Sequence, residues 1–102
     1  MTNMASVRAR PQVKKDLLDI WVRIAAASPL RADRYLEMLE HRMRLLSASP
    51  SLGNLRLDPS DDRVRAHGVD NYLIVFRSAP RPIEIVRVLY DPHDIADTLQ
   101  GV

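Results

Sequence analysis

The chain has 102 residues, of which 46% are hydrophobic and 27% charged, and its formal net charge is +2. A single hydrophobic core typically holds about 100 to 150 residues, so we expect one domain over residues 1–102 rather than two. Cysteine is absent, which excludes a disulfide framework, a thiol nucleophile and the usual structural zinc sites.

The apolar runs indicate the compartment of the protein, and its basic residues indicate the kind of partner that it binds. No apolar run is long enough for the core of a signal peptide or for a membrane span, so we expect a cytoplasmic protein. Arginine supplies 13 of the 15 basic residues, and its guanidinium group forms bidentate pairs with carboxylates and phosphates. This bias favours an acidic partner or a nucleic acid. The alternative is a general compositional preference, with arginine serving as an ordinary surface charge.

The first half of the chain predicts a short strand followed by a helical hairpin. Residues 6–10 alternate polar and apolar side chains, which is typical of a half-exposed strand. From Lys14 the apolar residues recur every three or four positions, as on one face of a helix that ends near Ala27. Ser28 suits the N-cap and Pro29 the first turn of a second helix, so the two helices should pack together.

The second helix carries an apolar stripe that can pack along the first. On its outer side Glu40 and Arg44 stand four residues apart, a spacing that favours an ion pair. The stripe alternates steps of three and four residues and contains Ala32, Leu36, Leu39, Met43 and Leu46.

Residues 47–62 have the composition of a long loop, rich in Ser, Pro, Gly, Asn and Asp. Loops of this length in a small protein are often functional. We expect an ordered middle that is anchored by the leucines of the loop, which are Leu52, Leu55 and Leu57.

Three strands are predicted after this loop. Residues 63–69 alternate, residues 72–78 are apolar enough for a central strand, and residues 83–90 contain no breaker. The Asp-Asn dipeptide after the first of them can form a two-residue hairpin turn. The expected fold class is therefore α+β in two layers, with an N-terminal strand, a helical hairpin, a three-stranded antiparallel meander, and residues 91–100 as a tail or short helix. One helical layer covers one sheet face, so the other face must be covered by a partner or tolerate water.

The histidines suggest an enzymatic alternative. A ribonuclease needs a base, an acid and a cation that stabilises the phosphorane. The residues that could supply these groups are His67, His93, Arg65, Arg87 and Asp91. The competing interpretation is that His67 points outward from a strand and His93 lies in an exposed turn. Spacing alone does not gather these residues into one site.

Metal and cofactor sites are not expected. His93 stands near Asp91, Asp94 and Asp97, but aspartates at the start of a helical turn serve first as caps. The 3 glycines of the chain stand far apart in the sequence, so they do not form a phosphate-binding loop.

Arg87 stands in an otherwise apolar row. By period two it shares a face with Ile83, Ile85 and Leu89, where an unpaired charge is costly. Its partner is either an internal carboxylate or backbone carbonyl, or an acidic segment of another protein that binds on the sheet face. Further arginines lie on the strands and their flanks, and they would create a positive field if they converged. The whole set is Arg8, Arg10, Arg56, Arg63, Arg65, Arg77, Arg81 and Arg87.

Several short motifs, spread over nearly the whole chain, point to one family. They are DL-x-x-IW at 16–21, P-x-x-G at 50–53, V-R at 64–65, Y-L-I-x-F at 72–76 and I-x-I-V-R-V-L at 83–89. Each motif is short, but in order and spacing from about residue 7 to residue 99 the chain resembles the ParE-like toxins of bacterial toxin–antitoxin modules, within the RelE/ParE superfamily.

The resemblance implies a helical hairpin against an antiparallel sheet and a cytoplasmic toxin. It implies that a ParD-like ribbon-helix-helix antitoxin holds the toxin inactive by wrapping an acidic C-terminal segment around it, and that DNA is contacted only through this complex. Free ParE-like toxins are expected to inhibit DNA gyrase and block replication, whereas RelE-like relatives are ribosome-dependent mRNA endoribonucleases. The fold that they share does not separate the two branches.

The residues of the last predicted strands and of the tail favour a gyrase inhibitor, which is not an enzyme, over a RelE-like ribonuclease. Leu73 follows Tyr72 where RelE-like ribonucleases tend to have arginine, and the tail offers neither tyrosine nor arginine. The chain also departs from the common ParE pattern, because Tyr90 stands where a histidine is expected and His93 lies near the expected arginine. A binding module that has lost its toxicity is the third alternative.

The resemblance, together with the preference of interfaces for arginine and aromatic residues, suggests two sets of contact residues. The set expected to bind the antitoxin is Trp21, Arg56, Arg65, Phe76 and Arg87. The surfaces expected to contact the target are those of the helical hairpin and of the tail, and the residues expected there are Tyr90, Asp91 and His93.

Overall fold

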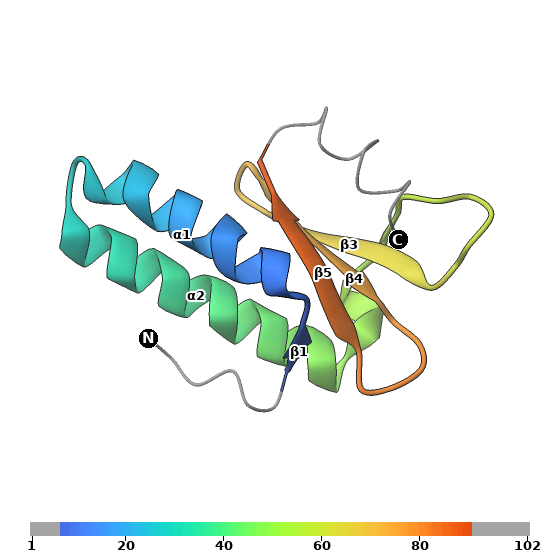
Figure 1. The fold of residues 1–102 in the computed structure, drawn as a ribbon. Coiled ribbons are helices and arrows are strands. Elements are labelled where there is room, and N and C mark those ends of the chain that lie inside the picture. The colour runs from blue at the N-terminus through green and yellow to red at the C-terminus, as the bar shows by residue number, and fades with distance from the viewer. Residues whose placement is uncertain (1–6, 91–102) are drawn as a thin grey trace.

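The structure, a computed structural model, describes residues 7–90 of the chain. Two helices lie side by side against a twisted sheet (Figure 1). This arrangement confirms the predicted two-layer α+β fold with its N-terminal strand, helical hairpin and antiparallel meander. The predicted tail at 91–100 lies outside the described residues. In chain order the elements are β1 (Arg8–Ala9), α1 (Pro11–Ala25), α2 (Pro29–Ala48), a 3₁₀ turn (Pro50–Leu52), β2 (Leu55–Arg56), β3 (Val64–Val69), β4 (Tyr72–Arg77) and β5 (Glu84–Leu89).

The helical hairpin forms where the sequence predicts it. Pro29 begins α2, and the side-chain oxygen of Ser28 accepts a hydrogen bond from the backbone N–H of Arg31 at 3.2 Å. This bond satisfies one of the backbone donors that a helix N-terminus leaves free. α1 begins at Pro11, earlier than the predicted Lys14, because proline has no N–H to satisfy and fits a first helical turn. Among the described residues, neither helix is long and apolar enough to cross a lipid bilayer.

The sheet has five strands in the order β1-β5-β4-β3-β2. β3, β4 and β5 form the predicted antiparallel meander, and the turn between β3 and β4 contains Asp70 with a φ of 54°. β1 pairs in parallel with β5 at one edge. β2, which the sequence pattern does not predict, pairs with β3 at the other edge, so the loop expected at 47–62 contributes a short strand.

Of the three leucines predicted to anchor this loop, only Leu57 does so. Leu52 and Leu55 are 46% and 45% exposed, so they do not hold the loop in place. Gly53 is buried instead, and a Cβ atom at this position would lie 2.2 Å from Cζ of Phe76. The loop is therefore held by the close approach of its backbone to a core aromatic ring, together with the partly buried Leu57.

Buried apolar side chains form two clusters, the larger of which joins both helices to the sheet. The smaller one contains only strand residues, with Leu57 and Leu73 packed against it. The chain itself buries these strand residues, so the prediction that this sheet face is left to a partner or to water is wrong. The members of the smaller cluster are Val64, Ala66, Val75, Val86 and Leu89.

A β-bulge in β5 changes which of its side chains share a face. The register with β4 skips Val86, so that two residues of β5 lie opposite one residue of β4. Ile85, before the bulge, joins the larger cluster, whereas Leu89, after it, joins the smaller one. The predicted common face of Arg87 with Ile83, Ile85 and Leu89 is therefore wrong, because the extra residue reverses the alternation of side chains.

Candidate partner-binding surfaces

The arginines of the strands and their flanks form ion pairs and hydrogen bonds within the chain. The pairs with carboxylates are Arg10 with Glu84, Arg56 with Asp62, Arg63 and Arg77 with Asp61, and Arg87 with Asp16. The bonds to backbone carbonyls join Arg8 to Pro82, Arg65 to Asp62 and Gly53, and Arg81 to Ser47 and Ala48. Each of these guanidinium groups therefore has an acceptor within the chain, and carboxylates offset the charge of those that form ion pairs.

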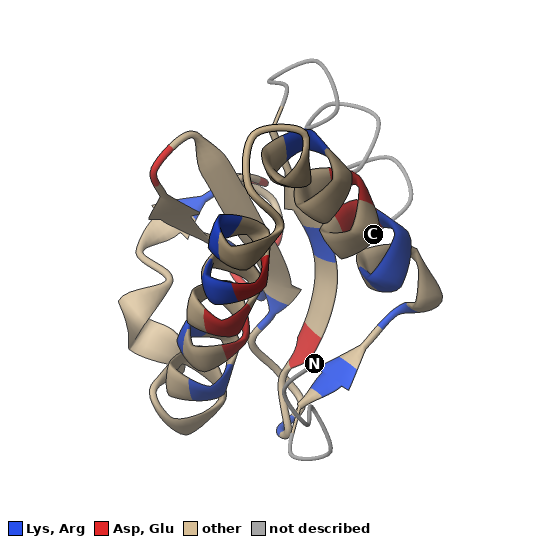
Figure 2. Cartoon of the chain, turned by 90° about the vertical axis from the view of Figure 1, so that its left-hand side faces the viewer, with Lys and Arg blue, Asp and Glu red and all other residues tan. Residues whose placement is uncertain are grey.

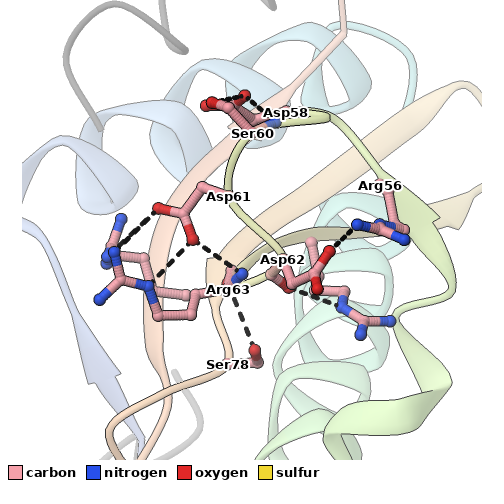
Figure 3. A network of polar contacts seen from close by, with 9 residues as sticks. Arg56, Asp58, Ser60, Asp61, Asp62, Arg63 and Ser78 are labelled. Carbon is pink, nitrogen blue, oxygen red and sulfur yellow. Dashed lines mark hydrogen bonds and ion pairs between the residues drawn. The ribbon is translucent and has the colours of Figure 1, made fainter.

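Asp61 is the centre of a polar network that precedes β3 (Figure 3). Its carboxylate accepts hydrogen bonds from the backbone N–H and from Nε of Arg63, both at 2.9 Å, and lies 3.7 Å from Nη2 of Arg77. The side-chain hydrogen bonds from Arg63 lower the pKa of Asp61 to about 2. In the same segment, hydrogen bonds from the hydroxyl and backbone N–H of Ser60 lower the pKa of Asp58. The network orders this segment from within the chain.

Arg87 finds its partner on α1. Asp16 accepts two parallel hydrogen bonds from the guanidinium group, from Nε at 2.8 Å and from Nη2 at 2.9 Å. Its Oδ2 atom also accepts the backbone N–H of Val88 at 2.9 Å, and 5% of its side chain is exposed. An internal carboxylate, one of the two alternatives that the sequence left open, is therefore the partner of Arg87.

The sequence contains a signal for the burial of Asp16. It stands three residues after Val13 and four before Ile20, and both of these apolar residues are buried. Residues at these spacings share one face of a helix. A carboxylate at such a position predicts a buried partner of opposite charge.

His67 on β3 is held by two neighbours. Its Nδ1 atom lies 3.1 Å from the carbonyl oxygen of Leu52, and its Nε2 atom lies 3.0 Å from Nη1 of Arg42, so it is turned toward α2 rather than outward. A carbonyl only accepts and a guanidinium only donates, so this geometry places the ring proton on Nδ1. Both nitrogens are engaged, which leaves His67 poorly placed as the base of a ribonuclease. Within residues 7–90, no three His, Asp or Glu side chains are grouped to hold a metal ion.

Tyr90, the predicted target residue that the structure describes, is 52% exposed. The centroid of its ring lies 5.2 Å from that of Tyr72, and the guanidinium carbon of Arg23 lies 4.5 Å from the centroid of the Tyr90 ring. A cation at this distance over an aromatic ring is attractive, so Tyr90 is held in one orientation at the surface. The other predicted target residues, Asp91 and His93, lie outside the described residues.

The residues predicted to receive an antitoxin do not form one surface. Phe76 is fully buried, so its ring supports the core and makes no direct contact with a partner. Arg56 and Arg65 lie opposite each other in β2 and β3, at the sheet edge remote from β1. Arg87 is paired with the carboxylate on α1. Of these five residues, Trp21 alone borders the groove between the helices.

This groove has a volume of about 710 Å³. Figure 2 shows acidic residues of α2 in a row along one side of the helix, apart from its basic residues. Leu18 lines the groove and is 59% exposed. In the sequence, a leucine outside the apolar stripe of its helix is the signal for an exposed apolar groove. The lining residues from α1 are Lys14, Lys15, Leu17, Leu18 and Trp21. Those from α2 are Asp33, Leu36, Glu37 and Glu40.

Glu40 lies at the bottom of the groove and is 1% exposed. The predicted ion pair with Arg44 on the outer side of α2 is wrong. Glu40 stands four residues after Leu36 and three before Met43, so it shares their buried side of the helix. Among the described residues, neither Oε2 of Glu40 nor Nη1 of Arg44 has a hydrogen-bond partner. A buried carboxylate, one of whose oxygens lacks a hydrogen-bond partner, therefore lines the groove.

The fold and the groove define a small α+β protein with a largely apolar groove on its helical layer. The structure is similar to a chain of the "Chromosomal ParDE TA system from P. aeruginosa", with a TM-score of 0.68 and 19% sequence identity over 85% of this chain and 96% of that chain. At this identity the likeness establishes the fold. The family model described as the ParE toxin of type II toxin-antitoxin system, parDE, matches residues 7–94, so the chain belongs to the ParE toxin family. No curated protein matches it in sequence.

Proposed function

We propose that this chain is the toxin of a type II toxin–antitoxin module and that it inhibits DNA gyrase, and hence replication, in the cytoplasm. The observation that supports the proposal is the match to the ParE toxin family over residues 7–94. Its antitoxin is a ParD-like ribbon-helix-helix protein with an acidic C-terminal segment, and the toxin reaches DNA only through their complex.

The toxin acts by binding a protein rather than by catalysis. Both ring nitrogens of His67 are engaged within the chain, which does not suit a proton-transfer role. Exposed apolar and aromatic side chains such as Leu18 and Tyr90 instead suit contact with another protein. Tyr90, with Asp91 and His93 after it, is the proposed contact with gyrase.

A supercoiling assay with purified gyrase tests this function. Micromolar toxin should inhibit supercoiling or stabilise cleaved DNA, and addition of the antitoxin should restore activity. Tyr90→Ala should weaken the inhibition, whereas Leu55→Ala should not, because Leu55 is exposed to a similar degree on a different part of the surface. Undiminished gyrase activity at micromolar toxin would refute gyrase as the target.

The purified toxin and its expression in cells also test the two alternatives, a RelE-type ribonuclease and a binding module without toxicity. A RelE-type ribonuclease would cleave ribosome-bound mRNA and lose its toxicity when His67 and His93 are both replaced by alanine. We expect intact mRNA and a fully toxic double variant. A binding module without toxicity would leave growth unaffected when it is expressed alone, and we expect growth to stop.

A further inference from the structure

We propose that the end of the helical hairpin, where α1 leads into α2, receives an acidic segment of gyrase and holds one of its apolar side chains in a pocket beside Arg31 and Arg34. The pocket, together with the neighbouring Arg23 and Tyr90, forms what we call the hairpin-end surface. The identity of the partner rests on the proposed function. The acidic and apolar character of the bound segment rests on this surface, which is separate from the groove described above.

The pocket has a volume of about 380 Å³ and faces away from the groove. Its residues on α2 stand at positions 31, 34, 35 and 38, on the side of the helix opposite to the groove residues at 33, 36, 37 and 40. Ligand pockets range from about 300 to 1,000 Å³, so this one suits a single side chain rather than a whole helix. The lining residues are Ile24, Arg31, Arg34, Tyr35 and Met38.

Arg31 and Arg34 bring positive charge to this pocket. Both are exposed, and within residues 7–90 neither guanidinium group forms an ion pair, unlike most of the strand arginines. Asp33, which stands between them in the sequence, accepts a hydrogen bond from Nε1 of Trp21 at 2.8 Å and lines the groove instead. A positive charge in the first turns of a helix opposes the helix dipole, so these two arginines do not stabilise α2 by their position. Their charge is available to a partner.

A row of aromatic rings joins the pocket to Tyr90. The hydroxyl of Tyr35 donates a hydrogen bond to Asp70 at 2.8 Å, which holds the ring at the pocket. The ring centroid of Tyr72 lies 5.8 Å from that of Tyr35 and 5.2 Å from that of Tyr90. At the far end of the row, the guanidinium carbon of Arg23 lies 4.5 Å from the centroid of the Tyr90 ring. The pocket and the exposed Tyr90 therefore belong to one pre-ordered surface.

Arg23 adds a third positive charge to this surface. Its Nη1 atom donates to the hydroxyl of Tyr72 at 3.4 Å, and in the part of the chain that the structure describes it forms no ion pair. The hydroxyl is neutral, so this bond leaves the charge of the guanidinium group uncompensated. An arginine above an aromatic ring keeps its attraction for an anion, and arginine and tyrosine are enriched in protein interfaces.

These features define the chemistry of the partner. Guanidinium groups pair with carboxylates or phosphates, and apolar walls such as those from Ile24 and Met38 require an apolar side chain. A single-stranded nucleic acid would need an open aromatic face for stacking, but Arg23 covers one face of the exposed Tyr90 ring. A protein segment that carries carboxylates around one apolar side chain satisfies the charge and the pocket together.

Gyrase inhibition by matched double variants tests the two rim arginines. Arg31→Gln with Arg34→Gln should raise the toxin concentration for half inhibition of supercoiling by about tenfold. The control is Arg8→Gln with Arg81→Gln, which removes the same charge from exposed arginines that bond only to backbone carbonyls, at the other end of α2. The control should stay within about twofold of wild type. Both double variants should keep the thermal midpoint of wild type, so that a loss of inhibition is not a loss of folding.

Ionic strength separates an electrostatic role of Arg31 and Arg34 from a structural one. Added salt should weaken the binding of wild-type toxin to gyrase and narrow the difference between wild type and the Arg31→Gln/Arg34→Gln variant. A difference that does not change with salt would overturn the acidic segment.

Met38→Gln tests the apolar side chain of the partner. It keeps the approximate size of the residue and places a polar amide in the pocket, so inhibition should weaken by about threefold or more. Leu45→Gln is the control, because Leu45 is 41% exposed on the same helix but does not line the pocket. Equal inhibition by the two variants would overturn the role of the pocket.

The remaining outcomes distinguish this inference from the proposed function. If wild-type toxin does not inhibit gyrase, both fail. If the Arg31→Gln/Arg34→Gln variant inhibits like wild type, gyrase remains the target and the inference alone is wrong. The variant should bind the antitoxin with an affinity within about twofold of wild type, and a loss as large as that for gyrase would assign the surface to the antitoxin and overturn the inference. Binding of the toxin to DNA alone that is lost in the same variant would also overturn it.

Discussion

Replacing Asp16 by alanine removes the carboxylate that joins α1 to β5. Two hydrogen bonds from the Arg87 guanidinium, at 2.8 and 2.9 Å, are lost, together with one from the Val88 backbone N–H at 2.9 Å. The Asp16 side chain is 5% exposed, so water does not readily take its place. Arg87 loses its carboxylate, and the Val88 N–H loses its acceptor.

The expected loss of stability follows from the burial of the two partners. Removing one member of a buried ion pair costs about 3–5 kcal/mol. The Arg87 side chain is 28% exposed, and hydration of this part reduces the penalty, so we expect Asp16→Ala to lower the free energy of unfolding by about 3 kcal/mol. For a protein of this size the thermal midpoint should fall by about 12–24 °C. Asp16→Asn keeps the shape and one acceptor oxygen, so it should lose about 2 kcal/mol.

Urea unfolding measures this loss, followed by far-UV circular dichroism and by the fluorescence of Trp21, the single tryptophan. Asp19→Ala is the matched control, because Asp19 is an exposed aspartate on the same helix and its removal should change stability by less than about 0.5 kcal/mol. Combining Asp16→Ala with Arg87→Met should reveal a coupling of about 1–3 kcal/mol. Equal stability of Asp16→Ala and Asp19→Ala would refute the reasoning.

Three further predictions concern the turns and loops. Gly53→Ala places a methyl group against the buried Phe76 ring and should cost about 1–3 kcal/mol in urea unfolding, whereas unchanged stability would mean that the ring has room to move. Ser28→Ala removes the N-cap of α2 and should cost about 1 kcal/mol, which Ser28→Asp should restore; equal unfolding midpoints of the two variants would contradict this. The pKa of Asp61 is about 2 in the folded protein against 3.8 ordinarily, so its contribution to stability is present above about pH 4 and is lost as the pH falls toward 2. The difference in unfolding free energy between wild type and Asp61→Asn should shrink over this range, and a constant difference would argue against the network.

The parts of the fold that the sequence predicts correctly depend on local chemistry. Ser28 and Pro29 alone predict where α2 begins. The turn at Asp70 depends only on the ability of Asp and Asn to adopt a positive φ. The bulge at Val86 cannot be predicted in this way. Because β5 has apolar residues on both faces, one extra residue does not interrupt an alternation of apolar and polar side chains. β2 is two residues long, too short to show alternation.

The candidate site is less predictable because its contacts join distant parts of the chain. Asp16 and Arg87 are 71 residues apart, and no spacing rule connects them. Phe76 was expected at an interface because it is aromatic, but it lies in a central strand under the helices and is buried. The charge of Glu40 favours the outer side of α2, whereas its position in the helix indicates the buried side. In each case residue type was a weaker guide than position.

The bond from Val88 to Asp16 also determines how the sheet meets other strands. β1 pairs with β5 over two residues, and beyond them Asp16 occupies the N–H that an incoming strand would need. An edge whose donors are already taken is a poor template for pairing with another chain. At Val88 this side of β5 therefore offers no free N–H to a strand of another chain, so the ion pair that joins α1 to β5 also makes this position a poor template for edge-to-edge association.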